Sequence, residues 1–399
     1  MKRILIGLCG IVLVAGAYLL SANWLFMTRY LGFVAGGYDP KTVPMDWYRP
    51  TQSLAQGDTT TLPVAEPDQR TIPDHVAREV LAFAEQNDTM ALIIARGGRI
   101  EVEQYWGGAG RDTQFNPQSM SKTLAAMLTG IAIGEGAFNS VDDPISLYLR
   151  EFEGDPRDAI TIRNLLQMSG GLEQIAKDYS PVPWSRGVRQ HFGTRFNHWV
   201  LQLELVDEPG SRFDYNNNET NLLGLVLERA VRQKYPEYLS EKIWQPLGLG
   251  PARAYLDRPG GDAMKSCCIL SRPIDWLKLG QLLLDDGIYQ GKRILPPEWV
   301  GEMVTPAATF PGYGYQVWLS PITLRGGSIR EQPPASPYLW WASEPFAGTV
   351  YGFTGFGFHH VWVLPEVDVV VVRAHSREWP EQPWDQARIP NLLLRGISH

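Results

Sequence analysis

The sequence has few cysteines and no block of basic residues. Among 399 residues there are three cysteines, Cys9 and the adjacent pair Cys267 and Cys268. Neighbouring cysteines rarely close a disulfide, so no natural pair remains to bridge a long loop, and a disulfide scaffold is excluded. Lysine and arginine total 36 against 43 aspartates and glutamates, a formal net charge of −7. A mildly acidic chain without basic runs argues against nucleic acid as a partner.

The composition is that of a globular protein, with 44% hydrophobic and 20% charged residues. Long apolar runs are absent apart from residues 4–27, which follow Lys2 and Arg3. About 20 apolar residues cross a bilayer, and basic residues before such a run favour a cytoplasmic N-terminus. A cleaved signal peptide is the alternative, but the run continues past its small-residue site at 15–17. We therefore expect a membrane anchor or signal segment over 1–27, with the rest of the chain in the periplasm or outside the cell.

The rest of the chain divides into an irregular segment and one large domain. Residues 28–73 are rich in proline and threonine and show no sustained period, which indicates a stalk or a strap on the domain. Strand patterns at 89–96 and 99–106 flank Gly97-Gly98, and a second hairpin is expected at 358–374. Helical patterns lie between these hairpins. The sequence thus predicts, over 74–399, an α+β fold of three α/β/α layers: a helix-flanked antiparallel sheet with an inserted helical subdomain at roughly 140–260.

Ser119 and Lys122 are the first candidates for chemistry. A helix from about Ser119 into the apolar run at 124–133 places both side chains on one face. A serine hydroxyl is a poor nucleophile until another group takes its proton, and a desolvated lysine one turn away is able to do so. Backbone N–H groups at the helix start would also receive an oxyanion. The structural alternative is a serine that caps a helix beside a lysine that reaches solvent.

Tyr215 and Asn217 form a second candidate pair, in a turn-rich loop before an apolar helical run. A phenol is able to shuttle a proton if nearby cations lower its pKa. The amide of Asn217 offers a donor and an acceptor together, so it suits a substrate carbonyl. An ordinary polar loop is the structural alternative.

Taken in order, these motifs resemble those of the serine β-lactamase-like hydrolases. That family includes class C β-lactamases, penicillin-binding D-amino-acid peptidases, related esterases and 6-aminohexanoate-dimer hydrolase. The resemblance runs from about Asp74 to Arg373 and also includes residues 160–172, 246–249 and 291–300. It implies an all-helical subdomain inserted into a helix-flanked antiparallel sheet, with the site in the crevice between them.

The resemblance also implies the role of each site residue. Ser119 would be the acylated nucleophile, Lys122 its partner, Tyr215 the general base that becomes the acid for the leaving group, and Asn217 the positioning amide. The Lys-Thr-Gly motif of penicillin-recognising members is missing from residues 350–359. As in the related esterases and 6-aminohexanoate-dimer hydrolase, a glycine-rich turn stands there instead. By register, the backbone N–H of Phe356 would complete an oxyanion hole with that of Ser119.

The predicted function is that of a membrane-tethered serine hydrolase acting on a carboxylic ester or a small amide through a Ser119 acyl-enzyme. The alternatives are a β-lactam- or peptide-binding sensor without turnover, and a true β-lactamase or D-amino-acid peptidase. Aromatic residues near the expected site favour an apolar pocket wall. No metal site and no cofactor are predicted, because the histidines lack a completing ligand pattern. The candidate pocket residues are Tyr351, Trp340 and Trp341.

Overall fold

A computed structural model describes residues 23–37, 43–175, 185–320, 342–375 and 384–397. The centre of the fold is a six-stranded antiparallel sheet in the order β3-β2-β11-β10-β9-β8. Its strands are β2 (Thr89–Arg96), β3 (Arg99–Tyr105), β8 (Trp318–Leu319), β9 (Tyr351–Gly355), β10 (His359–Leu364) and β11 (Val369–His375). Both predicted hairpins are present, and β11 pairs with β2, which joins the two ends of the chain in one sheet.

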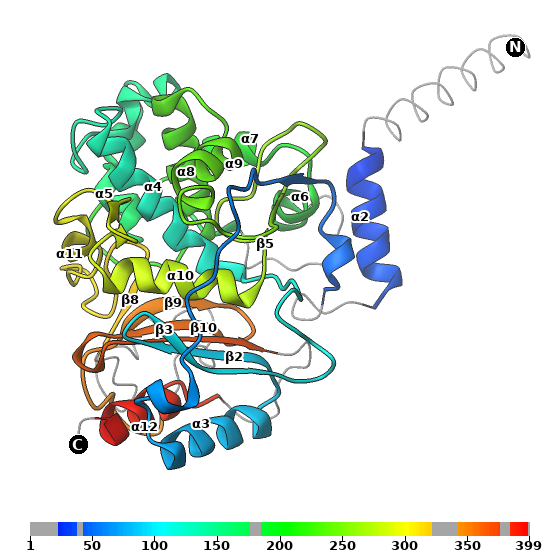
Figure 1. Ribbon diagram of the computed structural model, residues 1–399. Coiled ribbons are helices and arrows are strands. Elements are labelled where there is room, and N and C mark those ends of the chain that lie inside the picture. The colour runs from blue at the N-terminus through cyan, green and yellow to red at the C-terminus, as the bar shows by residue number, and fades with distance from the viewer. Residues whose placement is uncertain (1–22, 38–42, 176–184, 321–341, 376–383, 398–399) are drawn as a thin grey trace, which may run out of the picture.

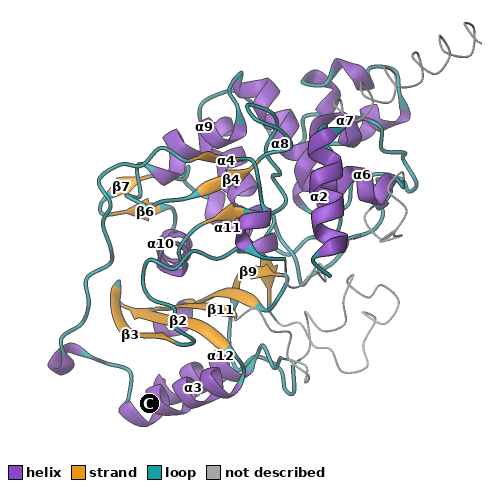
Figure 2. Ribbon diagram, turned by 90° about the vertical axis from the view of Figure 1, so that its right-hand side faces the viewer, coloured by secondary structure: helices purple, strands orange, loops and turns teal. Residues whose placement is uncertain are grey.

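Both faces of the central strands are buried, and this explains why the strands are largely apolar. Side chains alternate across a strand, so each strand supplies two cores. One core, against α3 (Asp74–Gln86) and α12 (Arg388–Ile397), contains Leu92, Ile94, Val369 and Val371. The other, against α10 (Pro273–Leu284), contains Ala91, Ile93, Ala95, Val370 and Val372. Figures 1 and 2 show α3 and α12 on one face of the sheet and α10 on the other.

The helical region lies beyond α10, on the side of the sheet away from α3 and α12 (Figure 1). Its larger helices are α4 (Lys122–Gly134), α5 (Ile162–Leu166), α6 (Arg186–Phe192), α7 (Phe196–Leu201), α8 (Asn217–Val231) and α9 (Tyr235–Leu239). Smaller elements complete the fold: β1 (Thr51–Ser53), β4 (Arg253–Tyr255), β5 (Ile269–Leu270), β6 (Ile288–Tyr289), β7 (Lys292–Arg293) and α11 (Trp299–Met303). The predicted fold class, an α+β arrangement with layered helices around an antiparallel sheet, is confirmed.

The helix α2 (Trp24–Ala35) crosses the boundary predicted between anchor and strap, and it packs onto the domain. Phe26 and Tyr30 are buried against Phe192 of α6. The buried guanidinium of Arg29 donates hydrogen bonds to the carbonyl oxygens of Arg49 (2.7 Å) and Leu256 (2.7 Å). This helix therefore ties residues that precede the sheet to the helical region (Figure 2).

The predicted membrane-anchored location is contradicted. Within the ranges given above, no helix is both long enough and apolar enough to cross a membrane. The described part of the predicted anchor lies in α2, which has 12 residues and buries Arg29 in the protein, whereas a bilayer span needs about 20 apolar residues. Residues 1–22 of the predicted anchor lie outside the described residues.

Candidate active site

Ser119 lies in the short 3-10 turn Gln118–Ser121, immediately before α4. The α-helix itself begins at Lys122, three residues later than the sequence pattern predicts. Gln118 adopts a positive φ of 52°, a conformation that non-glycine residues rarely take. The side chain of Asn116 stabilises it by accepting a hydrogen bond from the Gln118 N–H at 2.9 Å. This local turn places Ser119 at a partly exposed position at the head of a buried helix.

Lys122 is buried, with 1% of its surface exposed, and its Nζ lies 2.8 Å from the Oγ of Ser119. The same nitrogen donates a hydrogen bond to the carbonyl oxygen of Ser266 at 2.9 Å. Burial penalises the charged form and lowers the pKa of Lys122 to about 7. A substantial fraction of this amine is therefore uncharged near neutral pH, and its lone pair is able to accept the hydroxyl proton of Ser119.

Tyr215 lies in the loop before α8, and its phenol is hydrogen-bonded to Ser119. Its ring stands 5.0 Å from the Nζ of Lys122 and packs against Trp318, with ring centroids 5.3 Å apart. Burial raises the pKa of this phenol above its usual value. The structure thus brings Ser119, Lys122 and Tyr215 together, and Tyr215 remains protonated across the neutral range.

Asn217 is the first residue of α8, and its side chain is exposed. The neighbouring Asn216 is buried and caps the helix, because its side chain accepts a hydrogen bond from the Asn218 N–H at 3.0 Å. Asn216 also donates to the carbonyl oxygen of Leu172 at 2.9 Å. Asn216 therefore holds the helix start in place, whereas Asn217 is exposed at the first position of the helix.

The end of β9 approaches the turn that carries Ser119. A Cβ atom on Gly355 would overlap the carbonyl oxygen of Pro117, so this close approach requires glycine. Phe356 follows directly and is partly exposed. Its backbone therefore directly follows the close contact between β9 and the Ser119 turn, and its role in an oxyanion hole stays a prediction.

Of the three predicted pocket aromatics, the structure describes Tyr351 alone. Trp340 and Trp341 lie outside the described residues. Tyr351 begins β9, four residues before Gly355, which is about 13 Å along an extended strand. Its phenol lies near Asp285 and Asp286, at the end of α10. The aromatic side chains that do surround Tyr215 are Trp318 and Tyr313, which no sequence motif marks.

Glu219 is a buried acid beside the site that the sequence reading missed. It lies on α8, one turn after Tyr215, and its carboxyl accepts a hydrogen bond from the Gly170 N–H at 3.0 Å. Burial raises the pKa of this carboxyl to about 8. Glu219 thus holds the loop that contains Gly170. In the same loop, the carbonyl oxygen of Met168 accepts a hydrogen bond from the Asp214 N–H at 2.8 Å. The glutamate thereby supports the backbone just before Tyr215; a charged residue inside an apolar helical run was its only sequence signal.

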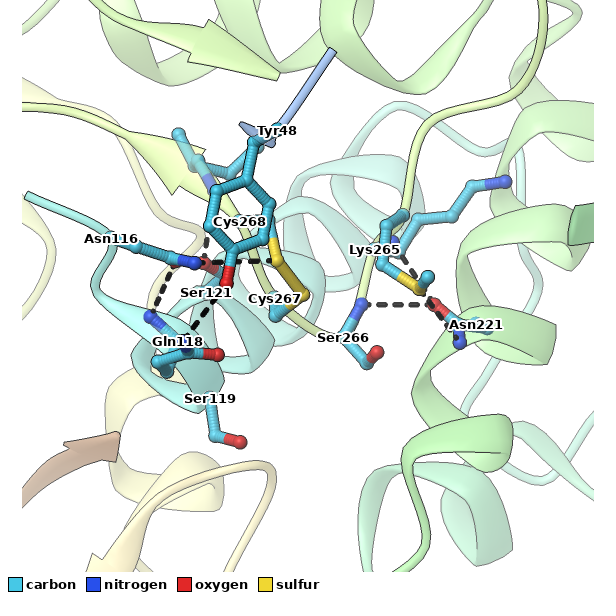
Figure 3. Close-up of a disulfide and its surroundings, with 12 residues drawn as sticks. Tyr48, Asn116, Gln118, Ser119, Ser121, Asn221, Lys265, Ser266, Cys267 and Cys268 are labelled. Atoms are coloured by element: carbon cyan, nitrogen blue, oxygen red, sulfur yellow. Dashed lines mark hydrogen bonds between the residues drawn. A yellow bond between two sulfur atoms is a disulfide. The ribbon is translucent and has the colours of Figure 1, made fainter. Parts of the chain in front are cut away.

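The prediction for the adjacent cysteines is wrong. Cys267 and Cys268 form a disulfide although they are sequence neighbours, and they lie beside the Ser119 turn (Figure 3). Cys268 has a positive φ of 73°, so the local backbone differs from that of an ordinary loop. Among the described residues, no three His, Cys, Asp or Glu side chains are grouped so as to hold a metal ion.

Comparison with known proteins assigns this chain to a family. The Beta-lactamase family matches residues 74–394. The 6-aminohexanoate-dimer hydrolase of Paenarthrobacter ureafaciens is 26% identical in an alignment of 355 positions that covers 83% of each chain.

Two solved structures share the fold. A Bacillus anthracis protein proposed to be a 6-aminohexanoate-dimer hydrolase has a TM-score of 0.70 at 18% identity, over 91% of this chain and 95% of its own. The hydrolase EstCE1, described as having promiscuous acyltransferase activity, has a TM-score of 0.58 at 19% identity, over 81% and 98%. At these identities the likeness shows the fold alone. Together with the family match, it establishes that this chain belongs to the beta-lactamase family and is a serine hydrolase.

Proposed function

We propose that the protein hydrolyses carboxylic esters or small amides through an acyl-enzyme on Ser119. The observation that carries this proposal is the buried Lys122, whose Nζ lies 2.8 Å from the Ser119 Oγ and whose pKa burial lowers to about 7. A lysine that is partly neutral at working pH is a suitable general base for a serine nucleophile. The names of the similar 6-aminohexanoate-dimer hydrolase and of EstCE1 fit an amide or ester substrate.

In the proposed reaction, Lys122 accepts the Ser119 proton as the serine oxygen attacks the substrate carbonyl. The backbone N–H groups of Ser119 and Phe356 receive the developing oxyanion. Tyr215 donates a proton to the departing alkoxide or amine, and the proton held by Lys122 replaces it. The family resemblance gives the base role to Tyr215; its raised pKa supports Lys122 as the first acceptor and Tyr215 as the donor. Asn217 is proposed to orient the substrate carbonyl, since it is exposed and follows Tyr215 by two residues.

Water then releases the acid by the same groups in reverse. Tyr215, having lost its proton to the leaving group and regained one from Lys122, stays the donor, while neutral Lys122 removes a proton from the attacking water. The acyl bond to Ser119 breaks, Tyr215 gives its proton to the Ser119 oxygen, and the protonated Lys122 restores the proton of Tyr215. Each proton that leaves one group in this sequence arrives at another, so no additional acid or base is needed.

The substrate preference follows from residues 350–359. This stretch carries Thr354 and Gly355 but no lysine, so a substrate carboxylate finds no cation there. A charge-assisted hydrogen bond of that kind contributes about 1.5–3 kcal/mol, or about ten- to a hundredfold in affinity. We therefore propose esters and small amides, rather than penicillins or D-alanyl peptides, as the preferred substrates.

Covalent labelling of the full chain tests the function. After treatment with a fluorophosphonate, the intact mass should show one adduct, located at Ser119 by peptide mapping, and p-nitrophenyl butyrate should be turned over. Penicillin and cephalosporin hydrolysis should be slower than ester hydrolysis. Labelling without turnover would favour the sensor alternative, and β-lactam hydrolysis that rivals ester hydrolysis would contradict the substrate preference. A folded protein without an adduct would refute the acyl-enzyme.

Replacing Tyr215 with phenylalanine tests the proton donor. We expect kcat for an alkyl ester such as ethyl butyrate to fall about a hundredfold, because an alkoxide leaves poorly without a proton and general acid catalysis contributes on the order of 10²–10⁴. The ring that packs on Trp318 is kept, so the thermal midpoint should change little. Tyr313→Phe is the matched control, since its ring also packs on Trp318 but it has no place in the proposed proton path. Near-normal kcat in Tyr215→Phe would remove this phenol from the mechanism.

A further inference from the structure

We propose that the disulfide between Cys267 and Cys268 is a redox-sensitive positioning element of the Ser119 site, which a dithiol opens with loss of activity. This inference rests on the proposed function, because its readout is turnover at Ser119. The disulfide lies between the turn that carries Ser119 and the residues around Ser266, as Figure 3 shows. Both sides of the disulfide are connected to a catalytic candidate by hydrogen bonds.

The first connection runs through the residue before the disulfide. The Ser266 carbonyl oxygen accepts a hydrogen bond from the Lys122 Nζ at 2.9 Å, so the position of this peptide orients the proposed base. On its other side, the Ser266 N–H donates to the Oδ1 of Asn221 at 2.9 Å, and the Lys265 N–H donates to the same oxygen at 3.0 Å. Asn221 on α8 fixes the Ser266 backbone through this hydrogen bond, and the disulfide constrains the chain from Cys267, the next residue.

The second connection runs through Cys268 to the nucleophile turn. The Asn116 amide nitrogen lies 3.7 Å from the Cys268 Sγ as a hydrogen-bond donor. The oxygen of that same amide accepts from Gln118, the residue immediately before Ser119. The Ile269 N–H also donates to the Ser121 Oγ at 3.4 Å. The disulfide segment therefore contacts the turn of Ser119 and the partner of Lys122 at once.

The disulfide closes a small ring that contains the peptide bond between the two cysteines, and the ring restricts the torsions of both. Cys268 has a φ of 73°, in the region that non-glycine residues disfavour. Once the ring opens, Cys268 is free to return to an ordinary conformation. Because the Ser266 carbonyl precedes the ring directly, this relaxation shifts the hydrogen-bond acceptor of Lys122.

The sulfur atoms differ in access. Cys267 is partly exposed, whereas 2% of Cys268 is exposed. A thiolate of the dithiol attacks the Cys267 sulfur, breaks the bond between the two cysteines and releases Cys268 as a thiol after it takes a proton. The second thiol of the reagent then displaces Cys267 and closes the disulfide of the reagent. The protein gains two electrons and two protons, and the dithiol loses both.

Steady-state kinetics of the full chain before and after dithiothreitol test the inference. Intact mass after alkylation, with peptide mapping to 267 and 268, verifies that the bond is open. We expect kcat for p-nitrophenyl butyrate to fall about tenfold with a smaller change in KM, because a displacement on the order of 1 Å at a catalytic group costs up to about a hundredfold. Reoxidation should restore kcat. A loss caused by unfolding would instead appear as a lost thermal transition at the assay temperature.

Two variants make the test specific. The Cys267→Ser/Cys268→Ser double variant should have the kcat of the reduced protein and no response to dithiothreitol. Cys9→Ser should keep the full response, since the third cysteine is outside the proposed element. Unchanged kcat after verified reduction, or a bond that resists excess dithiol in the folded protein, would overturn the inference alone. Absence of turnover in the oxidised protein would overturn the proposed function, and the inference with it.

Discussion

Replacing Ser119 with alanine should abolish measurable ester turnover. The proposed reaction places the acyl group on the Ser119 oxygen, which the alanine variant lacks. Removal of a serine nucleophile costs on the order of 10⁴-fold or more in kcat, while binding and oxyanion stabilisation remain. Initial rates with p-nitrophenyl butyrate and the intact mass after fluorophosphonate treatment measure the two consequences: lost turnover and a lost adduct.

Ser121→Ala is the matched control for Ser119→Ala. Both serines lie in the same turn, but Ser121 is buried and its oxygen accepts a hydrogen bond from the Ile269 N–H. We expect Ser121→Ala to keep the adduct and most of the turnover. Turnover and labelling that persist in Ser119→Ala, or that disappear equally in both variants, would contradict the assignment of the nucleophile.

Replacing Lys122 with methionine should lower kcat/KM by about 10³-fold and change its pH dependence. In the parent protein the base must be neutral, and the pKa of Lys122 lies at about 7. Activity should therefore rise with pH up to about 7 and then level off, because kcat/KM reports the ionisation of the free enzyme. Methionine fills much of the same space without a titrating group, so this rise should be absent from the variant. Profiles of kcat/KM from pH 5 to pH 9 measure both effects.

Lys278→Met provides the comparison for Lys122→Met. Lys278 is also buried, and burial lowers its pKa to about 8, but its Nζ donates to the carbonyl oxygens of Leu247 and Gly248 instead of contacting Ser119. Its replacement should leave the rise of kcat/KM near pH 7 in place. A rise that survives in Lys122→Met would show that another group is the base. Thermal melting of both variants verifies that the compared proteins are folded.

The features predictable from sequence are those that local chemistry determines. Gly97 and Gly98 both adopt positive φ and form the turn between β2 and β3, as the pair predicts. The spacing of Ser119 and Lys122 placed them together because one turn connects them. The grouping of Tyr215 with Ser119 required the family resemblance, since Tyr215 lies in a loop almost one hundred residues later.

The unpredicted features depend on contacts between distant segments or on backbone atoms. The partner of Lys122 is the carbonyl of Ser266, and a backbone oxygen leaves no signature in a sequence. The disulfide depends on the unusual φ of Cys268, which a pattern of side chains does not reveal. Burial of Arg29 depends on carbonyl groups at Arg49 and Leu256, and these backbone acceptors likewise have no signature in the sequence.

The docking of residues 43–54 also bears on how a shorter version of this enzyme would behave. Tyr48 is buried against Tyr255 and reaches the amide of Gln118, the neighbour of Ser119. A truncation that starts at Asp74, where the family match begins, would strip this cover from Tyr255 and expose aromatic surface to water. The packed domain is consequently larger than the region of family similarity. An expression boundary drawn from sequence similarity alone would remove a residue that contacts the immediate neighbour of Ser119.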